Sequence, residues 1–164
     1  MLTLMTAAAL PALPAEQHSL PRAELRDPGP TVRFMLAGNA HVTFQSLKTD
    51  VRYTYRVVAA KDSTSSVSHF VHVLTGPDSY EYLGCIYGSR SWGHGRKSRI
   101  APGAASAKAF AWCWARLAID HRMPGTLAVY HEGRCGKCGR RLTTPESIQT
   151  GLGPVCGSKM GGAS

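Results

Sequence analysis

The chain has 164 residues and a mass of 17.6 kDa, which limits it to one domain or to one domain with a small appendage. Its hydrophobic content of 43% is enough for a globular centre, and no apolar segment is long enough to cross a bilayer, so no membrane span is expected. The net charge of +9 favours an acidic partner, of which nucleic acid is the commonest.

Residues 1–30 are rich in alanine, leucine and proline, and their apolar residues follow no sustained period. The prolines interrupt any helix, and Pro28-Gly29-Pro30 closes the stretch. We therefore predict a mobile N-terminal arm over residues 1–30, with a short docked helix as the less favoured alternative.

Between residues 31 and 87, five short segments combine β-branched and aromatic residues, a composition that favours strands. These segments are 31–36, 41–45, 51–58, 67–74 and 80–87. Turn-forming residues such as Gly38-Asn39 and Gly76-Pro77 separate them. The spacing predicts an antiparallel sheet or a partly closed barrel.

The next segments complete a domain that we predict over residues 31–130. A basic loop covers residues 88–99, and residues 105–119 place Ala109, Phe110, Cys113 and Leu117 along one helical stripe. Residues 126–130 form a final strand. The predicted fold class is α+β, with about five to six strands in a small antiparallel sheet and one main helix.

The last segment, residues 131–160, contains a cysteine cluster with metal-ligand spacing. Cys135 and Cys138 form a Cys-x-x-Cys pair, and a glycine follows each thiol. These glycines allow the tight turns of a zinc knuckle, in which both sulfurs face one point. Cys156 supplies a third thiol farther along the chain.

The residues between the knuckle and Cys156 predict a short helix. Thr143 or Thr144 can cap it, Pro145 suits its first turn, and Gly151 can end it in the left-handed conformation. Gly153-Pro154 then directs Cys156 back to the metal. The predicted module is a treble-clef-like or ribbon-like unit around Zn²⁺.

Structural zinc requires four ligands, so a fourth must join the three thiols. His131 lies at the end of the last predicted strand and is the favoured candidate. The alternatives are Cys113, Cys85, His121 or a water molecule. A redox role for the Cys-x-x-Cys pair is less favoured, because glycines follow both thiols.

Five cysteines, an odd number with uneven spacing, are typical of a reducing compartment rather than of a disulfide framework. The expected location is therefore the cytoplasm. No catalytic function is expected, because His69 and His72 would face opposite sides of their strand and no nucleophile motif occurs.

This C-terminal segment resembles that of a family of small uncharacterised proteins that is frequent in bacteriophages and actinobacterial genomes. The residues that carry the resemblance are His131, Cys135, Cys138, Gly139, Arg140, Leu142, Thr143, Pro145, Ser147, Ile148, Gly151, Gly153, Pro154 and Cys156. Upstream, Tyr53–Arg56 and Leu74–Pro77 also look like phage proteins with this segment. The resemblance implies a zinc-binding phage accessory protein, active in the host cytoplasm, and implies no established reaction.

Positive charge is concentrated in one part of the chain. Residues 81–141 contain eleven Lys or Arg against three carboxylates, a net charge of +8 out of the total of +9. Single-stranded nucleic acid is commonly bound by rings that stack on bases and cations that meet phosphates. The predicted binding residues are Arg90, Trp92, His94, Arg96, Lys97, Arg99, Arg134, Lys137, Arg140 and Arg141.

The sequence thus predicts a non-enzymatic, zinc-stabilised protein that binds nucleic acid, with single strands favoured. The alternative is an interaction module that binds and modulates a host protein. A third reading of the basic loop is structural, with Trp92 in the core and the charges serving solubility.

Overall fold

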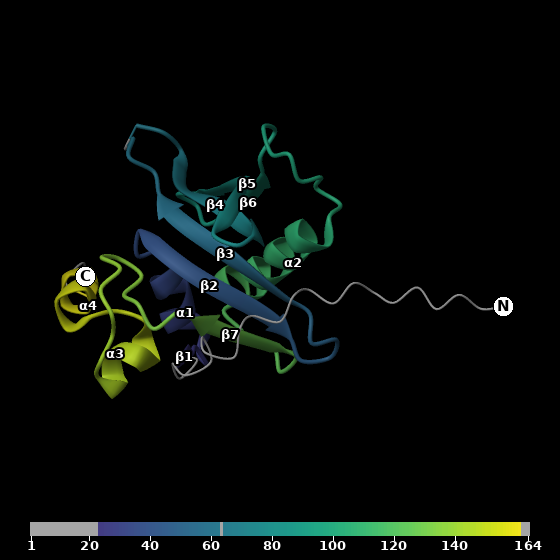
Figure 1. The fold of residues 1–164 in the computed structure, drawn as a ribbon. Coiled ribbons are helices and arrows are strands. Elements are labelled where there is room, and N and C mark those ends of the chain that lie inside the picture. Colours follow the sequence, from purple (N-terminus) through teal and green to yellow (C-terminus); the bar gives the residue numbers. More distant parts are fainter. Residues whose placement is uncertain (1–22, 63, 162–164) are drawn as a thin grey trace.

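The protein is described by a computed structural model that covers residues 23–62 and 64–161. In these residues a seven-stranded antiparallel sheet runs in the order β1-β7-β2-β3-β4-β5-β6 (Figure 1). The strands are β1 (Ala23–Glu24), β2 (Asn39–Ser46), β3 (Arg52–Ala59), β4 (Val67–Gly76), β5 (Ser79–Tyr87), β6 (Trp92–His94) and β7 (Leu127–His131).

The helices divide into two groups. Those of the sheet domain are α1 (Pro28–Met35), α2 (Ala105–Trp114) and the π-helical segment η2 (Ala115–Ile119), which continues α2. Those of the C-terminal module are α3 (Pro145–Thr150) and α4 (Pro154–Gly161). The module lies beside one end of β2, next to α1 (Figure 1).

The main core lies between one face of the sheet and the helices α1, α2 and η2. Alternate residues of the strands, such as Val42, Val57 and Val71, point into it and are fully buried. Phe110 and Leu117 enter it from α2 and η2. In Figure 1 α1 lies behind β2, so the viewer faces the opposite side of the sheet, which no described helix covers.

The predicted fold class is confirmed at the coarse level, since the fold is α+β with an antiparallel sheet. The sheet is larger than predicted, because β1 and β6 join it as edge strands. The segment 105–119 is helical as predicted, and Phe110, Cys113 and Leu117 of the predicted stripe are buried.

The prediction of a strand over residues 31–36 is wrong, because these residues belong to α1 and its C-cap. Pro28 stands at the first helical position, where a missing N–H costs nothing. The side chains of Val32, Phe34 and Met35 are buried while Arg33 is exposed, a pattern that fits a helix face as well as a strand. Short apolar segments are ambiguous in this way.

The predicted N-terminal arm falls mostly on residues 1–22, which lie outside the described residues. Its last part belongs to the fold: Ala23 and Glu24 pair with β7, and Leu25 is almost completely buried. The predicted basic loop 88–99 likewise contains β6, which pairs with β5. No helix of the described residues is long and apolar enough to cross a membrane.

Candidate metal centre

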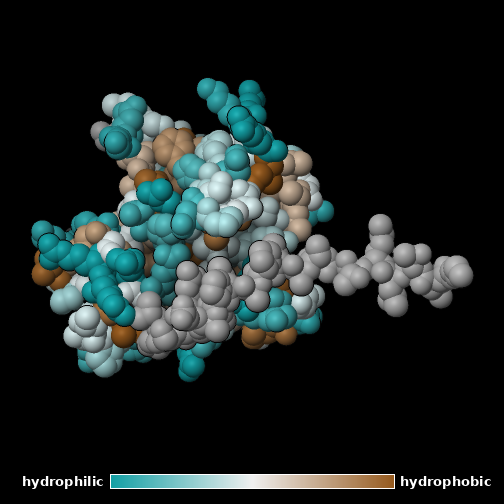
Figure 2. Space-filling model, viewed as in Figure 1, coloured by the Kyte–Doolittle hydropathy of each residue, from teal (hydrophilic) through white to brown (hydrophobic). Residues whose placement is uncertain are grey.

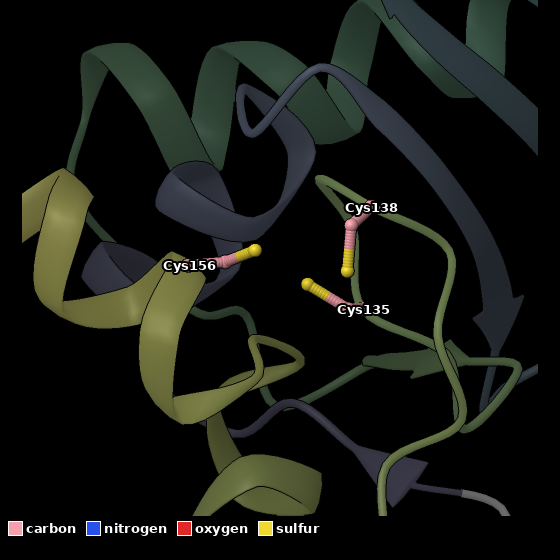
Figure 3. A group of neighbouring side chains, drawn as sticks. All are labelled: Cys135, Cys138 and Cys156. Atoms are coloured by element: carbon pink, nitrogen blue, oxygen red, sulfur yellow. The ribbon is translucent and has the colours of Figure 1, made fainter.

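Three thiols meet at the junction of the knuckle and α4. The sulfurs of Cys135, Cys138 and Cys156 all lie within 4.8 Å of one another, and Figure 3 shows them pointing toward a common centre. A tetrahedral zinc site with Zn–S bonds of about 2.3 Å requires sulfurs about 3.8 Å apart. The three thiols could therefore hold a metal ion with a small adjustment of the side chains.

The knuckle owes its shape to its glycines. The Gly139 N–H donates to the carbonyl of Cys135 (2.9 Å), and the Cys135 N–H donates to the carbonyl of Arg140 (2.8 Å). Gly139 has a φ of 74°, a left-handed conformation that a glycine adopts without strain. The backbone therefore reverses at Gly139, directly after the second thiol, and the turn over residues 135–140 keeps both sulfurs close together.

The helix α3 follows the predicted signals closely. Thr144 caps it by accepting from the Ser147 N–H, Pro145 lies in the first turn, and Gly151 ends it at a φ of 72°. The helix α4 then begins at Pro154 and carries Cys156 in its first turn. This return of the chain brings the third thiol to the knuckle.

The three thiols differ in exposure and in their surroundings. Cys135 is 1% exposed and packs in a small apolar cluster with Ala37, Leu142 and Leu152, whereas Cys138 is exposed. Burial raises the pKa of Cys135, but N–H donors from Cys138, Gly153 and Lys137 outweigh it and lower this pKa to about 7. Backbone amides thus stabilise a thiolate at this sulfur.

For Cys156 the surroundings raise the pKa of the thiol instead of lowering it. Burial, followed by hydrogen bonds to the thiols of Cys138 and Cys135, raises the pKa of Cys156 to about 11. Thiolates crowded together repel one another, and a bound cation is the usual compensation in such a cluster.

His131 is not brought into this group, although it was the predicted fourth ligand. Its imidazole is 5% exposed, with Nδ1 3.0 Å from the Gly133 N–H and Nε2 2.6 Å from the Ile148 carbonyl oxygen. Because an amide donates and a carbonyl accepts, Nε2 carries the proton and both nitrogens are engaged. Burial lowers the pKa of His131, which keeps the ring neutral.

The other candidates for a fourth ligand also lie elsewhere. Cys113 is buried in the core on α2, Cys85 contacts the Tyr82 hydroxyl (3.0 Å) on β5, and His121 is exposed after η2. Among the described histidines, cysteines and carboxylates, none joins the three thiols.

Phe34 of α1 joins the module to the sheet domain, a role that sequence reasoning missed. A Cβ on Gly136 would lie 2.7 Å from its ring, and one on Gly151 would lie 2.4 Å from it. The ring also packs against His131, with centroids 5.3 Å apart. The two glycines, which were assigned to turns, therefore also make room for a side chain that is distant in sequence.

Two of the predicted nucleic-acid residues are engaged within the fold. Trp92 is half-buried, packs on Phe110 with ring centroids 4.6 Å apart, and fills the space above Gly84. His94 places Nε2 2.8 Å from the carbonyl oxygen of Ile100. For Trp92 the structural reading given above therefore fits the packing better than a stacking role.

The eight predicted cations lie on the surface. They are Arg90, Arg96, Lys97, Arg99, Arg134, Lys137, Arg140 and Arg141, and every one is exposed. Within the described residues none of them forms a salt bridge, since the pairs present involve Arg26, His41 and Arg116. Figure 2 shows hydrophilic side chains projecting from several edges of the molecule, among them its top and its left side.

Comparison with known proteins finds a match for the C-terminal part of the chain. Residues 125–161 match the model of a family of unknown function, DUF6011. The matched span contains β7, the three thiols, α3 and α4, in agreement with the resemblance to an uncharacterised family. No curated protein and no solved structure gives a significant match.

Proposed function

We propose that this chain is a non-enzymatic, phage-type accessory protein that binds nucleic acid and is stabilised by one zinc ion. The metal is assigned from the donor set, because three thiolates at knuckle geometry are the preferred ligands of structural zinc. The ion would hold the knuckle to α4, and its role would be to order the module. Cytoplasmic location is part of the same proposal, since thiolates bind zinc in a reducing compartment.

The observation that carries the binding function is the set of eight exposed cations without a carboxylate partner among the described residues. Exposed charges of one sign attract a polyanion and release its counterions. The cations come from two segments, residues 90–99 and residues 134–141, so that the surface can meet several phosphates at once.

The binding function is tested by fluorescence anisotropy with a labelled single-stranded oligonucleotide at increasing salt. Five neutralised phosphates give a slope of about −3.5 in log affinity against log salt. Replacement of Arg140 and Arg141 by Gln should weaken binding and flatten the slope by about 1.4. Arg26→Gln is the matched control, because this exposed arginine already pairs with Glu24. Absence of binding at low salt would refute the function.

The zinc assignment has a separate test in metal analysis of the purified protein. We expect about one equivalent of zinc, which His131→Gln should retain because the imidazole contacts backbone groups. Loss of zinc in this variant would restore His131 as the fourth ligand.

A host protein is the second candidate partner, and the exposed side of α2 and η2 favours it. Trp112 of α2 is 44% exposed and Ile119 of η2 is 52% exposed. Exposed apolar residues of this kind mark contact sites for proteins. Affinity capture from host lysate, with and without nuclease, separates the two: a nuclease-resistant stoichiometric protein would favour this candidate.

A further inference from the structure

The side of the sheet that no described helix covers has an unusual composition for a solvated surface. Val71 and Val73 of β4 point into the core, so Phe70, His72 and Leu74 point to the other side. Register and alternation give the remaining members of this open face. They are Asn39, His41, Thr43 and Gln45 of β2, Arg52, Thr54, Arg56 and Val58 of β3, Tyr80, Tyr82 and Cys85 of β5, Ala128 and Tyr130 of β7, and Glu24 of β1.

Aromatic rings form a group on the β4 and β5 part of the open face. The rings of Phe70 and Tyr82 lie 6.3 Å apart in an edge-to-face arrangement, and the imidazole of His72 lies 5.7 Å from Tyr82. Phe70 is 38% exposed and Leu74 of the same strand is 36% exposed, so apolar side chains are accessible at this group. Flat rings on a sheet surface are suited to stacking against nucleic-acid bases.

The basic loop passes beside this aromatic group at Gly95 and Ser98. The Tyr82 ring occupies the space above Gly95, where a Cβ would lie 2.4 Å from it. The Ser98 hydroxyl donates to the carbonyl of Tyr82 (2.7 Å) and fixes the loop to β5. Arg96 and Lys97, which are exposed, therefore start at the edge of the aromatic group.

The cysteine knuckle borders the other side of the open face. The Asn39 N–H donates to the carbonyl of Gly136 (2.7 Å), and the Arg56 guanidinium donates to the side chain of Asn39 (3.2 Å). The open face is concave here, because Nδ1 of His41 on β2 lies 3.1 Å from the Tyr80 hydroxyl on β5. A path along the sheet leads from the knuckle through Asn39 and Arg56 to the aromatic group. From β2 to β6 it crosses four strand spacings, about 19 Å.

The charges along this path suit a polyanion. Arg52 and Arg56 occupy the open face, and its positions on β2, β3, β4 and β5 carry no Asp or Glu. Glu24 of β1, opposite Tyr130, also lies on this face and pairs with Arg26. Glu132 follows β7 at the border, where its carboxylate lies 3.7 Å from His41. Bases would meet rings in the middle of the path, and phosphates would meet cations on both sides of it.

We propose that the open face is the base-binding surface for single-stranded nucleic acid, with Phe70 and Tyr82 stacking on bases between the knuckle and the 95–98 segment. Arg56 and Arg96 bind phosphates of the same nucleic-acid strand. This inference rests on the proposed function and differs from the sequence prediction in its aromatic residues, because Trp92 belongs to the core side of the sheet.

The test is a titration of fluorescein-labelled oligothymidylate of about 15 nucleotides, a length that covers one sheet surface of this kind. Phe70→Ala should weaken binding about five- to 150-fold and leave the salt slope unchanged, because stacking involves no counterions. Arg56→Gln should reduce the slope by about 0.7. The matched control is Trp112→Ala, an exposed aromatic residue on α2 whose replacement should not affect binding.

The outcomes separate this inference from the function on which it rests. If the unaltered protein fails to bind the oligonucleotide at low salt, both are refuted. Suppose that the unaltered protein binds, that Phe70→Ala binds with the same affinity, and that the variant at Arg140 and Arg141 binds more weakly. The open face is then refuted and the proposed function stands. Equal weakening by Trp112→Ala also refutes the open face. Circular dichroism of each variant confirms that the fold is retained.

Discussion

The C-terminal module and the sheet domain obtain their structure in different ways. The sheet domain has a core cluster of twenty-one buried residues, which extend along the chain from Leu25 to Val129. The module has a cluster of only four, of which one is a thiol and one, Ala37, comes from outside it. So small a core cannot stabilise a segment of thirty residues alone. We therefore expect the module to depend on its metal and on Phe34, and the sheet to depend on neither metal nor thiols.

The largest expected effect is that of removing a thiol. Cys138 is exposed, so Cys138→Ser removes little packing but deletes one of three ligands. We expect loss of bound zinc and of hydrogen-exchange protection in residues 131–161, while the sheet keeps its protection. The metal-coupled ordering involved is on the order of 10 kcal/mol. Cys85→Ser, outside the group, should retain zinc. If residues 131–161 stayed protected from hydrogen exchange in zinc-free protein, the module would not depend on its metal as we expect.

Phe34→Ala should affect both regions, because this ring packs in the main core and also against the module. Truncation of a buried phenylalanine costs about 3–5 kcal/mol. We expect this loss in urea unfolding, together with weaker zinc retention. Phe34→Leu, which keeps most of the apolar volume, should cost less. A full-size loss of stability with unchanged zinc affinity would show that the two regions are independent.

Three glycines of the module allow a finer test. An alanine at position 151 would have to adopt a positive φ, and its Cβ would clash with the Phe34 ring. An alanine at position 139 would adopt a positive φ without a clash, and one at position 153 would have neither problem. Thermal unfolding should therefore rank Gly151→Ala as the most damaging. Gly139→Ala should cost about 1–2 kcal/mol, and Gly153→Ala about 0.5 kcal/mol or less. Equal losses at positions 139 and 151 would mean that the contact with Phe34 is unimportant.

The smallest expected effect is a pH dependence that arises in the sheet. Burial lowers the pKa of His69 and of His72 below the ordinary value of 6.5. Between the lowered pKa of the folded protein and the pKa of 6.5 in the unfolded chain, the unfolded chain binds more protons. The free energy of unfolding therefore falls as the pH drops below 6.5. His69→Gln should flatten this dependence in urea titrations at constant free zinc. An unchanged slope would indicate that His69 does not contribute.

The module could be predicted in detail because its signals are local. The Thr144 cap, Pro145 and the left-handed Gly151 each act within a few residues, and the structure contains all three features. The roles of His131 and Phe34 could not be predicted this way. His131 has metal-ligand chemistry, but its nitrogens contact backbone groups that only the folded chain brings near it.

For the sheet domain, composition and spacing predicted β2, β3, β4, β5 and β7, but neither edge strand nor the order of the strands in the sheet. The segment 31–36 combined residues that suit both a strand and a helix face, and burial against β2 and η2 selected the helix. Trp92 stands among arginines in the sequence, yet the strand pairing of β6 turns its ring toward Phe110.

By itself, the sequence determined that the chain has an α+β fold, a knuckle with a returning third thiol, and a concentration of positive charge. These follow from propensities, turn chemistry and counting, which act within short stretches of chain. The tertiary structure decided which face of each strand is buried, which imidazole stays outside the thiol group, and which aromatic rings reach the surface. Such choices depend on contacts between residues far apart in sequence, and these form only when the sheet assembles.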